Sequence, residues 1–269
     1  MIAVVDYQKG NLKSVERGLI AAGGEAFITA DASEIAKADA IVLPGVGAFA
    51  DAAATMCELG QMEAIRDRVR AGVPFLGICL GEHLMFEHGV EGAPEGNPAC
   101  GLGLLPGTVV AMPRCDAQGK AFKVPHVGWN TIEMPSCNGG VTVPPCGEGG
   151  GNAVLSSGGA GGGAARSSAA KRGLFEHGAF PDSTPQPGSN LAFACPLFDG
   201  IAPGEYFYFT HSYIAPTGSH TIAETTHSVR FTSAVQFGEC AFGVQFHPEK
   251  SSDAGARVLA NFVAIAARG

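Results

Sequence analysis

The first eighty residues alternate between short apolar runs and helical patterns, and this alternation constrains the fold more than any other feature of the sequence. The apolar runs occupy residues 2–5, 26–29, 40–43 and 73–78. Between them, apolar side chains recur at helical spacing over 12–20 and 61–70. Continuously apolar strands are typical of parallel sheets that are buried on both faces. The pattern predicts an α/β fold with a doubly wound, largely parallel sheet flanked by helices, and ligands bound beyond the carboxyl ends of the strands.

The second half is less regular and contains a long segment of different character. We expect strands at 207–210 and 240–246 and a closing helix at 253–267. Fourteen of the 56 residues from 137 to 192 are glycine, with almost no apolar periodicity, so this segment cannot pack a core. We interpret 1–269 as a single domain interrupted by a flexible insertion at about 137–192. A functional segment is the alternative, because long unstructured loops are uncommon without a role.

Charge and cysteine spacing exclude several functional classes. The net charge of −8 gives no basic surface for nucleic acid or an anionic membrane. No apolar run reaches the roughly 20 residues that span a bilayer, and the first residues lack the features of a signal peptide, so we expect a cytoplasmic protein. The eight cysteines include no C-x-x-C pair, which argues against a zinc site and favours reduced thiols, one of which is reactive.

Cys79 has the sequence context of a nucleophile. Gly77 and Gly81 flank it in a pentapeptide, GICLG, that follows a predicted strand and precedes a predicted helix. Small residues at these positions permit the tight turn that exposes a nucleophile at the top of a sheet. The sulfur would lie at a helix N-terminus, which favours the thiolate. A buried structural cysteine in a glycine-rich turn is the alternative.

Two segments supply the other parts of such a site. His247 and Glu249 flank a proline that favours an extended chain, so their side chains would point to one side and act as base and orienter. A strand-end histidine with a solvated glutamate is the alternative.

Gly45 and Gly47 follow another strand end and allow backbone N–H groups to turn toward an oxyanion. A phosphate-binding loop is disfavoured, because no Lys-Ser/Thr follows and G-x-G-x-x-G is absent.

With these elements, the chain resembles the class I (triad) glutamine amidotransferases, and more narrowly the glutaminase subunits of imidazole glycerol phosphate synthase. The matching segments are 10–15 (GNLKSV), 43–47 (LPGVG), 77–81 (GICLG), 125–130 (PHVGWN), 208–213 (YFTHSY) and 243–251 (GVQFHPEKS). The elbow and the His-Pro-Glu segment indicate only the superfamily. The segments 125–130 and 208–213 point to the narrower family.

The resemblance implies a flavodoxin-like core, a function and a set of site residues. Cys79 would attack the side-chain amide of glutamine, His247 would act as base and then acid, and Glu249 would hold the imidazole. Glutamate and ammonia would be the products, with no metal and no organic cofactor. The residues implied in oxyanion or substrate binding are Val46, Gly47, Leu80, His83, Ser212 and Tyr213.

The resemblance also implies a partner. The ammonia would travel to a (β/α)₈ cyclase subunit that makes imidazole glycerol phosphate and an aminoimidazole carboxamide ribonucleotide in histidine biosynthesis. Asn11, Trp129, Asn130 and Lys250 would lie toward this cyclase in a heterodimer, and occupation of the cyclase site would make the oxyanion strand competent. A core aromatic is the alternative for Trp129. We interpret His126 and His211, which also match family positions, as structural histidines.

The sequence departs from the family after the elbow. The family usually has Met-Gln where this chain has Glu82 and His83, so an imidazole replaces an amide expected to touch glutamine. A charged Glu82 turned toward the sulfur would oppose thiolate formation. We therefore expect altered glutamine binding with the triad retained.

A glutaminase serving a different synthase and a non-catalytic binding subunit remain alternatives, and a cysteine peptidase is disfavoured because nothing indicates a peptide groove.

Overall fold

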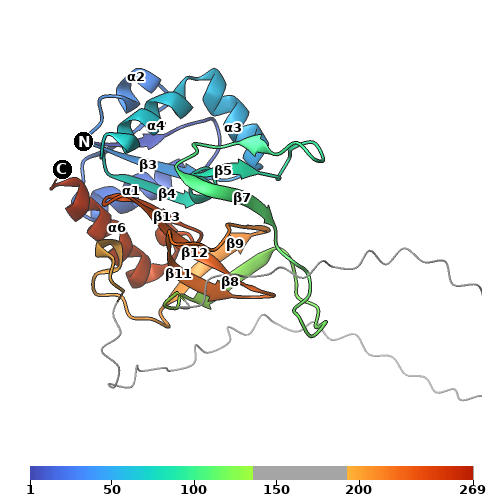
Figure 1. Ribbon diagram of the computed structural model, residues 1–269. Helices are drawn as coiled ribbons and strands as arrows, with labels where there is room; N and C mark the ends of the chain where they lie inside the picture. The colour runs from blue at the N-terminus through green and yellow to red at the C-terminus, as the bar shows by residue number, and fades with distance from the viewer. Residues whose placement is uncertain (136–192, 269) are drawn as a thin grey trace, which may run out of the picture. The chain divides into compact units, whose positions relative to one another are not determined.

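The apolar runs of the sequence form the centre of one mixed sheet. The computed structural model describes residues 1–135 and 193–268. Seven strands lie in the order β11-β12-β13-β4-β3-β1-β2 (Figure 1). Their bounds are Ile2–Val5 (β1), Ala26–Thr29 (β2), Ala40–Gly45 (β3), Phe75–Cys79 (β4), Thr221–Thr226 (β11), Arg230–Phe237 (β12) and Ala241–Val244 (β13). Strands β2, β1, β3, β4 and β13 pair in parallel, and β12 and β11 continue the sheet antiparallel.

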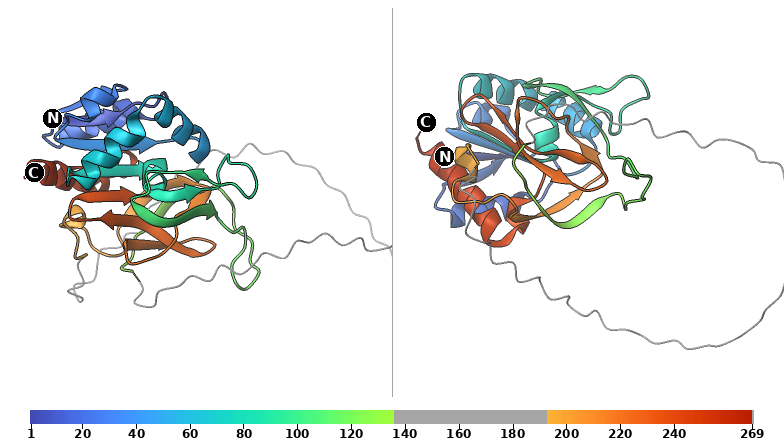
Figure 2. Two further views of the ribbon diagram at one scale, coloured as in Figure 1. Left: turned by 45° about the horizontal axis from the view of Figure 1, so that its top comes forward. Right: turned by 60° about the horizontal axis from the view of Figure 1, so that its bottom comes forward.

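Helices cover both faces of this sheet, as Figure 2 shows from two directions. The helices are Leu12–Ala21 (α1), Ala32–Ile35 (α2), Phe49–Glu58 (α3), Gln61–Arg70 (α4), Leu80–His83 (α5) and Ser252–Ala266 (α6). Alternation along β1 divides the core, because Ile2 and Val4 pack with α1 and α6, whereas Ala3 and Val5 pack with α2, α3 and α4. The doubly wound α/β prediction is therefore confirmed.

Two smaller sheets complete the described part. The four-stranded sheet has the order β10-β7-β5-β6, and β8 pairs with β9 in an antiparallel ribbon. The bounds are Phe86–Gly89 (β5), Ala99–Cys100 (β6), Leu105–Ala111 (β7), His126–Thr131 (β8), Tyr206–His211 (β9) and Tyr213–Ile214 (β10). Single turns of 3-10 helix occupy Pro196–Phe198 (η1) and Pro248–Lys250 (η2). Most of these elements carry little periodicity of their own; β7, for example, contains a proline and a glycine.

The strands and helices whose bounds the sequence predicted end within two residues of the predicted positions. Strands β1 and β2 and helix α4 have the expected bounds. Asn11 occupies the N-cap position of α1, but its side chain makes no capping hydrogen bond. The helix after the elbow is a single turn, so the helix dipole invoked for Cys79 is small. The insertion predicted at about 137–192 lies outside the described residues, and the single-domain interpretation stays a prediction.

Candidate active site

Cys79 ends β4 in a strained backbone conformation. Its φ of 55° and ψ of −107° lie outside the regions that L-residues favour. The two glycines of the elbow are required by packing. A Cβ on Gly77 would stand 2.5 Å from the carbonyl oxygen of Gly81, and one on Gly81 would stand 1.9 Å from that of Leu43. The turn thus holds the cysteine at the carboxyl edge of the parallel strands.

His247 and Glu249 form a buried pair just beyond β13. The imidazole Nδ1 lies 3.0 Å from Glu249 Oε1, and both side chains are almost completely buried. The contact does not arise from a continuous extended chain, as the sequence suggested; His247 is extended, but η2 begins at Pro248 and turns the carboxylate back. Because Nδ1–H donates to the carboxylate, Nε2 is left for another reaction, and it has no hydrogen-bond partner among the described residues.

The protonation of His247 responds to its neighbours. Burial by itself lowers the pKa of the imidazole, but its interactions with Cys79 and Glu249 raise that pKa to about 9. The imidazole therefore readily holds a proton. A protonated imidazole beside a cysteine can act as a general acid.

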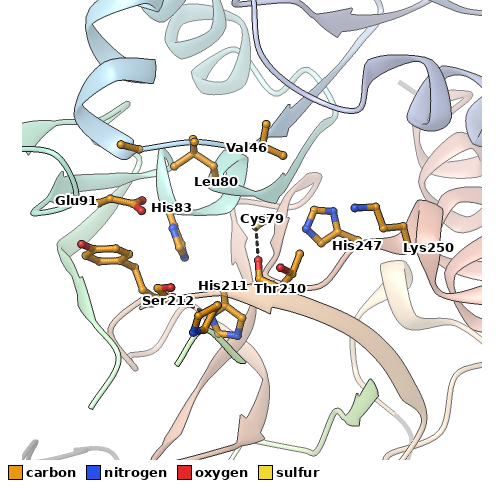
Figure 3. Close-up of a pocket in the computed structure, with 14 residues that line it drawn as sticks. Val46, Cys79, Leu80, His83, Glu91, Thr210, His211, Ser212, His247 and Lys250 are labelled. Carbon is orange, nitrogen blue, oxygen red and sulfur yellow. Dashed lines mark hydrogen bonds between the residues drawn. The ribbon is translucent and has the colours of Figure 1, made fainter. Parts of the chain in front are cut away.

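A cavity of about 510 Å³ opens at this edge of the sheet (Figure 3). Cys79 and His247 both line it, whereas Glu249 does not and supports His247 from outside. All the residues expected to bind the oxyanion or substrate line the cavity, namely Val46, Gly47, Leu80, His83, Ser212 and Tyr213. Lys250, expected at the partner interface, lines it as well. Glu91 also lines the cavity, and the sequence did not predict this carboxylate because no local motif marks it.

The loop expected to bind an oxyanion is held by a buried tyrosine. The N–H of Val46 donates to the Tyr7 hydroxyl at 2.9 Å, and this hydroxyl lies 3.2 Å from the carbonyl oxygen of the same residue. Burial raises the pKa of Tyr7, so the phenol remains a neutral donor and acceptor. In this structure the Val46 N–H is therefore engaged and not available to an oxyanion, contrary to the expectation from sequence. Gly47 follows with a φ of 100°, a conformation that favours glycine.

The two residues that depart from the family motif take different directions. His83 lines the cavity, and its Nε2 lies 2.7 Å from Gln245 Oε1. Glu82 is absent from the cavity wall and packs its side chain against Gly243 of β13. Neither carboxyl oxygen has a hydrogen-bond partner among the described residues, and burial, followed by the charge of Cys79, raises the Glu82 pKa well above its ordinary value. The sequence left open a charged Glu82 that would repel the Cys79 thiolate. In the structure the raised pKa instead favours the neutral carboxyl group.

A chain of hydrogen bonds links the β8–β9 ribbon to the cavity. His211 Nδ1 lies 2.9 Å from the carbonyl oxygen of Tyr213, so this nitrogen carries a proton. His211 Nε2 must then accept from His126 Nδ1, at 3.0 Å, and His126 Nε2 accepts from Asn130 Nδ2 at 3.2 Å. Burial lowers the pKa of His126 to about 4 and that of His211 well below its ordinary value, which agrees with two neutral rings. The structural interpretation of these histidines fits this arrangement.

The residues expected at a partner interface lie apart from the core. Trp129 is 42% exposed and makes an edge contact with Tyr208, so it is not a core aromatic. Val127 and Tyr206 of the same ribbon are exposed as well. Asn11 is half-buried at the start of α1, and neither it nor Asn130 lines the cavity.

The described part of the chain shows neither a metal centre nor a membrane-spanning helix. Among residues 1–135 and 193–268, no cluster of three or more histidine, cysteine or carboxylate side chains has a geometry that would hold a metal ion. In the same part of the chain, no helix combines the length and apolar character needed to cross a membrane.

Comparison with known proteins identifies the family. The family model described as glutamine amidotransferase class-I matches residues 3–144. The imidazole glycerol phosphate synthase subunit HisH of Moorella thermoacetica is 36% identical over 263 residues, covering 97% of this chain and 93% of that protein. The HisH subunit of Rhodopirellula baltica is 35% identical over 264 residues, covering 97% and 96%.

Solved structures support the same fold. A crystal structure described as a glutamine amidotransferase aligns with a TM-score of 0.58 at 16% identity, covering 99% of this chain and all of that one. The glutaminase domain of Trypanosoma brucei CTPS with bound acivicin aligns at 0.53 and 14% identity, covering 99% and 93%. These identities speak for the fold alone, but the sequence relatives span nearly the whole chain. The protein therefore belongs to the class I glutamine amidotransferases and, among them, to the HisH family of glutaminase subunits.

Proposed function

We propose that this chain hydrolyses glutamine to glutamate and ammonia at Cys79 and passes the ammonia to a (β/α)₈ cyclase that forms imidazole glycerol phosphate. One observation carries the catalytic part of the proposal. A cysteine on a strained elbow and a histidine oriented by a buried carboxylate line the same cavity. A nucleophile, a base and an orienter are what acyl transfer from an amide requires.

The chemistry follows from these positions. The Cys79 thiolate attacks the side-chain carbonyl carbon of glutamine, and the C=O π electrons move to the oxygen of a tetrahedral intermediate. His247 gives its proton to the departing nitrogen, so that ammonia leaves and a glutamyl thioester remains. His247 then takes a proton from water, whose oxygen attacks the thioester and releases glutamate and the thiolate. Glu249 keeps Nδ1 protonated throughout and thereby directs Nε2 toward the reaction.

The oxyanion needs donors that this conformation only partly offers. Leu80 and Gly47 lie at the cavity, but the Val46 N–H is bound to Tyr7. We infer that the loop from Gly45 to Gly47 reorients before efficient turnover, which breaks the Tyr7 contact. Cyclase binding is the event that the family resemblance implies for this step, and it would make the glutaminase dependent on its partner.

The remaining cavity residues suit an amino acid substrate. Glu91 can offer a carboxylate to the ammonium group of glutamine, and Ser212 and Tyr213, which also line the cavity, can offer hydroxyl and backbone groups. Lys250 provides a cation at the rim for a carboxylate. These assignments rest on the chemistry of the lining residues, and glutamine titration of the corresponding variants tests them.

The partner surface is assigned to the β8–β9 ribbon and its surroundings. Exposed aromatic and aliphatic side chains there, Val127, Trp129 and Tyr206, have the composition of an interface centre. Asn130 joins this surface to the cavity through the two neutral histidines. Asn11 and Lys250 are assigned to the same interface by resemblance, and we place the resulting heterodimer in the cytoplasm.

The decisive experiment measures glutamate release by the purified chain, alone and with a cyclase subunit and its nucleotide ligand. Glutamate formed with the liganded partner and abolished by Cys79→Ala supports the proposal. A Cys57→Ala variant is the matched control, because Cys57 is exposed on α3 and does not line the cavity. Complex formation without glutamate under any condition would favour a non-catalytic binding subunit, and activity only with a different synthase would redirect the assignment of the partner.

A further inference from the structure

Two polar groups besides His247 approach the Cys79 sulfur in the described part of the chain. One is the backbone carbonyl oxygen of Thr210, 3.9 Å from Sγ, to which the thiol can donate. The other is the side-chain amide of Gln245. Gln245, the residue after β13, is completely buried, and its amide Nε2 lies 3.7 Å from Cys79 Sγ. Its other amide atom, Oε1, lies 2.7 Å from His83 Nε2. His83 is 3% exposed and comes from the turn that follows the elbow. The amide is thus held between an imidazole and the sulfur.

The hydrogen-bonding properties of these groups fix their protons. An amide oxygen only accepts, so the His83 nitrogen that faces it must carry the proton. The His83 ring is neutral, so its other nitrogen carries no proton. Burial lowers the pKa of this ring to about 4, although the hydrogen bond to Gln245 opposes the shift. In this structure the amide oxygen of Gln245 faces His83, and its NH₂ group faces the sulfur. A flipped amide would place its oxygen against a thiolate, which is repulsive.

We propose that His83 is a positioning residue that orients the Gln245 amide so that it donates a hydrogen bond to the Cys79 thiolate. This inference deepens the proposed glutaminase function. Only its effect on the rate of glutamine hydrolysis rests on that function. A donor to the anionic sulfur favours the thiolate over the thiol, as hydrogen bonds to any charged form do. The departure from the family motif at His83 then preserves activation of the nucleophile.

This role differs from direct contact with glutamine. The protonated nitrogen of His83 is already used by Gln245, so only the lone pair of Nδ1 remains for a ligand. A substrate-binding role would chiefly change the KM for glutamine. A positioning role changes the reactivity of the sulfur when no glutamine is present.

Alkylation of Cys79 by iodoacetamide as a function of pH separates these roles. Mass spectrometry of the Cys79 peptide gives the rate in the full chain, and the exposed Cys57 and Cys100 serve as controls in the same sample. His83→Leu removes the donor at similar size, whereas His83→Gln restores one. We expect His83→Leu to slow alkylation of Cys79 about three- to tenfold near neutral pH, the range of one hydrogen bond, and His83→Gln to stay near the wild-type rate.

A second variant protects the test from misfolding. Gln245→Met should slow Cys79 to the same degree, and the double variant should be no slower than either single variant, because the two side chains act as one unit. The alkylation plateau at high pH reports access to the sulfur and should be unchanged. An unchanged pH profile in His83→Leu, or a change confined to the KM for glutamine, overturns the proposal. A shifted profile in a chain that never releases glutamate upholds it and instead contradicts the proposed function.

Discussion

Replacing Glu82 tests whether the carboxyl group beside the reactive cysteine is neutral in the folded protein. The side chain is completely buried against Gly243, and its two oxygens have no hydrogen-bond partner among the described residues. Burial raises its pKa well above the ordinary value of 4.5, and the charge of Cys79 adds to this shift. In the unfolded chain the same carboxyl ionises near its ordinary pKa. Between the two pKa values the folded state therefore binds more protons, and stability falls as pH rises.

The size of this effect follows from linkage. Within that window one such group lowers the free energy of unfolding by up to about 1.4 kcal/mol per pH unit, tenfold in the ratio of folded to unfolded protein. Glu82→Gln cannot ionise and should remove the slope. Glu82→Met also removes an unpaired polar group at similar length, so at about pH 5 we expect it to be roughly 1–3 kcal/mol more stable than the wild type.

Urea unfolding followed by circular dichroism, in reducing buffer from about pH 5 to 7, measures these differences. Subtracting the Glu82→Gln curve from the wild-type curve cancels the titration of every other group that the two proteins share. The difference should grow steadily with pH in favour of the variant. Parallel curves for the two proteins would mean that Glu82 ionises normally in the fold, and the argument from burial would be wrong.

Three further predictions concern the loop, the histidine pair and the partner surface. Tyr7→Phe releases the Val46 N–H and should raise glutamate release without the cyclase several-fold; an unchanged basal rate would show that Tyr7 does not restrain the loop. Because the pKa of His126 is lowered to about 4, stability should decline as pH falls from about 6.5 toward 4, and His126→Phe should flatten that decline in acid unfolding curves. Trp129→Ala should weaken cyclase binding in calorimetry by about 30-fold or more, whereas Ile20→Ala, at another exposed apolar residue on α1, should not; equal losses would contradict the assigned surface.

The parts of the protein that sequence predicts well depend on neighbouring residues. The parallel core can be predicted from sequence because a strand buried on both faces must be continuously apolar. The flanking helices can be predicted because their apolar residues recur at helical spacing. The elbow can be predicted because the two glycines that avoid a steric clash lie within two residues of Cys79. His247 and Glu249 are separated by one residue, so their pairing needs only a local turn. The predicted pairing of His247 with Glu249 is present, although the chain after His247 forms a 3-10 turn and not the expected extended segment.

Tertiary structure decided the contacts that control the reactive groups. Tyr7 meets Val46 across 39 residues, and His83 meets Gln245 across 162, separations at which no periodicity links the partners. The sequence likewise left open whether Glu82 would face the sulfur, because two adjacent residues in a one-turn helix point in different directions and packing decides which faces the cavity. Local sequence fixes where a strand or turn can form, whereas the protonation and orientation of a buried side chain depend on groups that only folding brings to it.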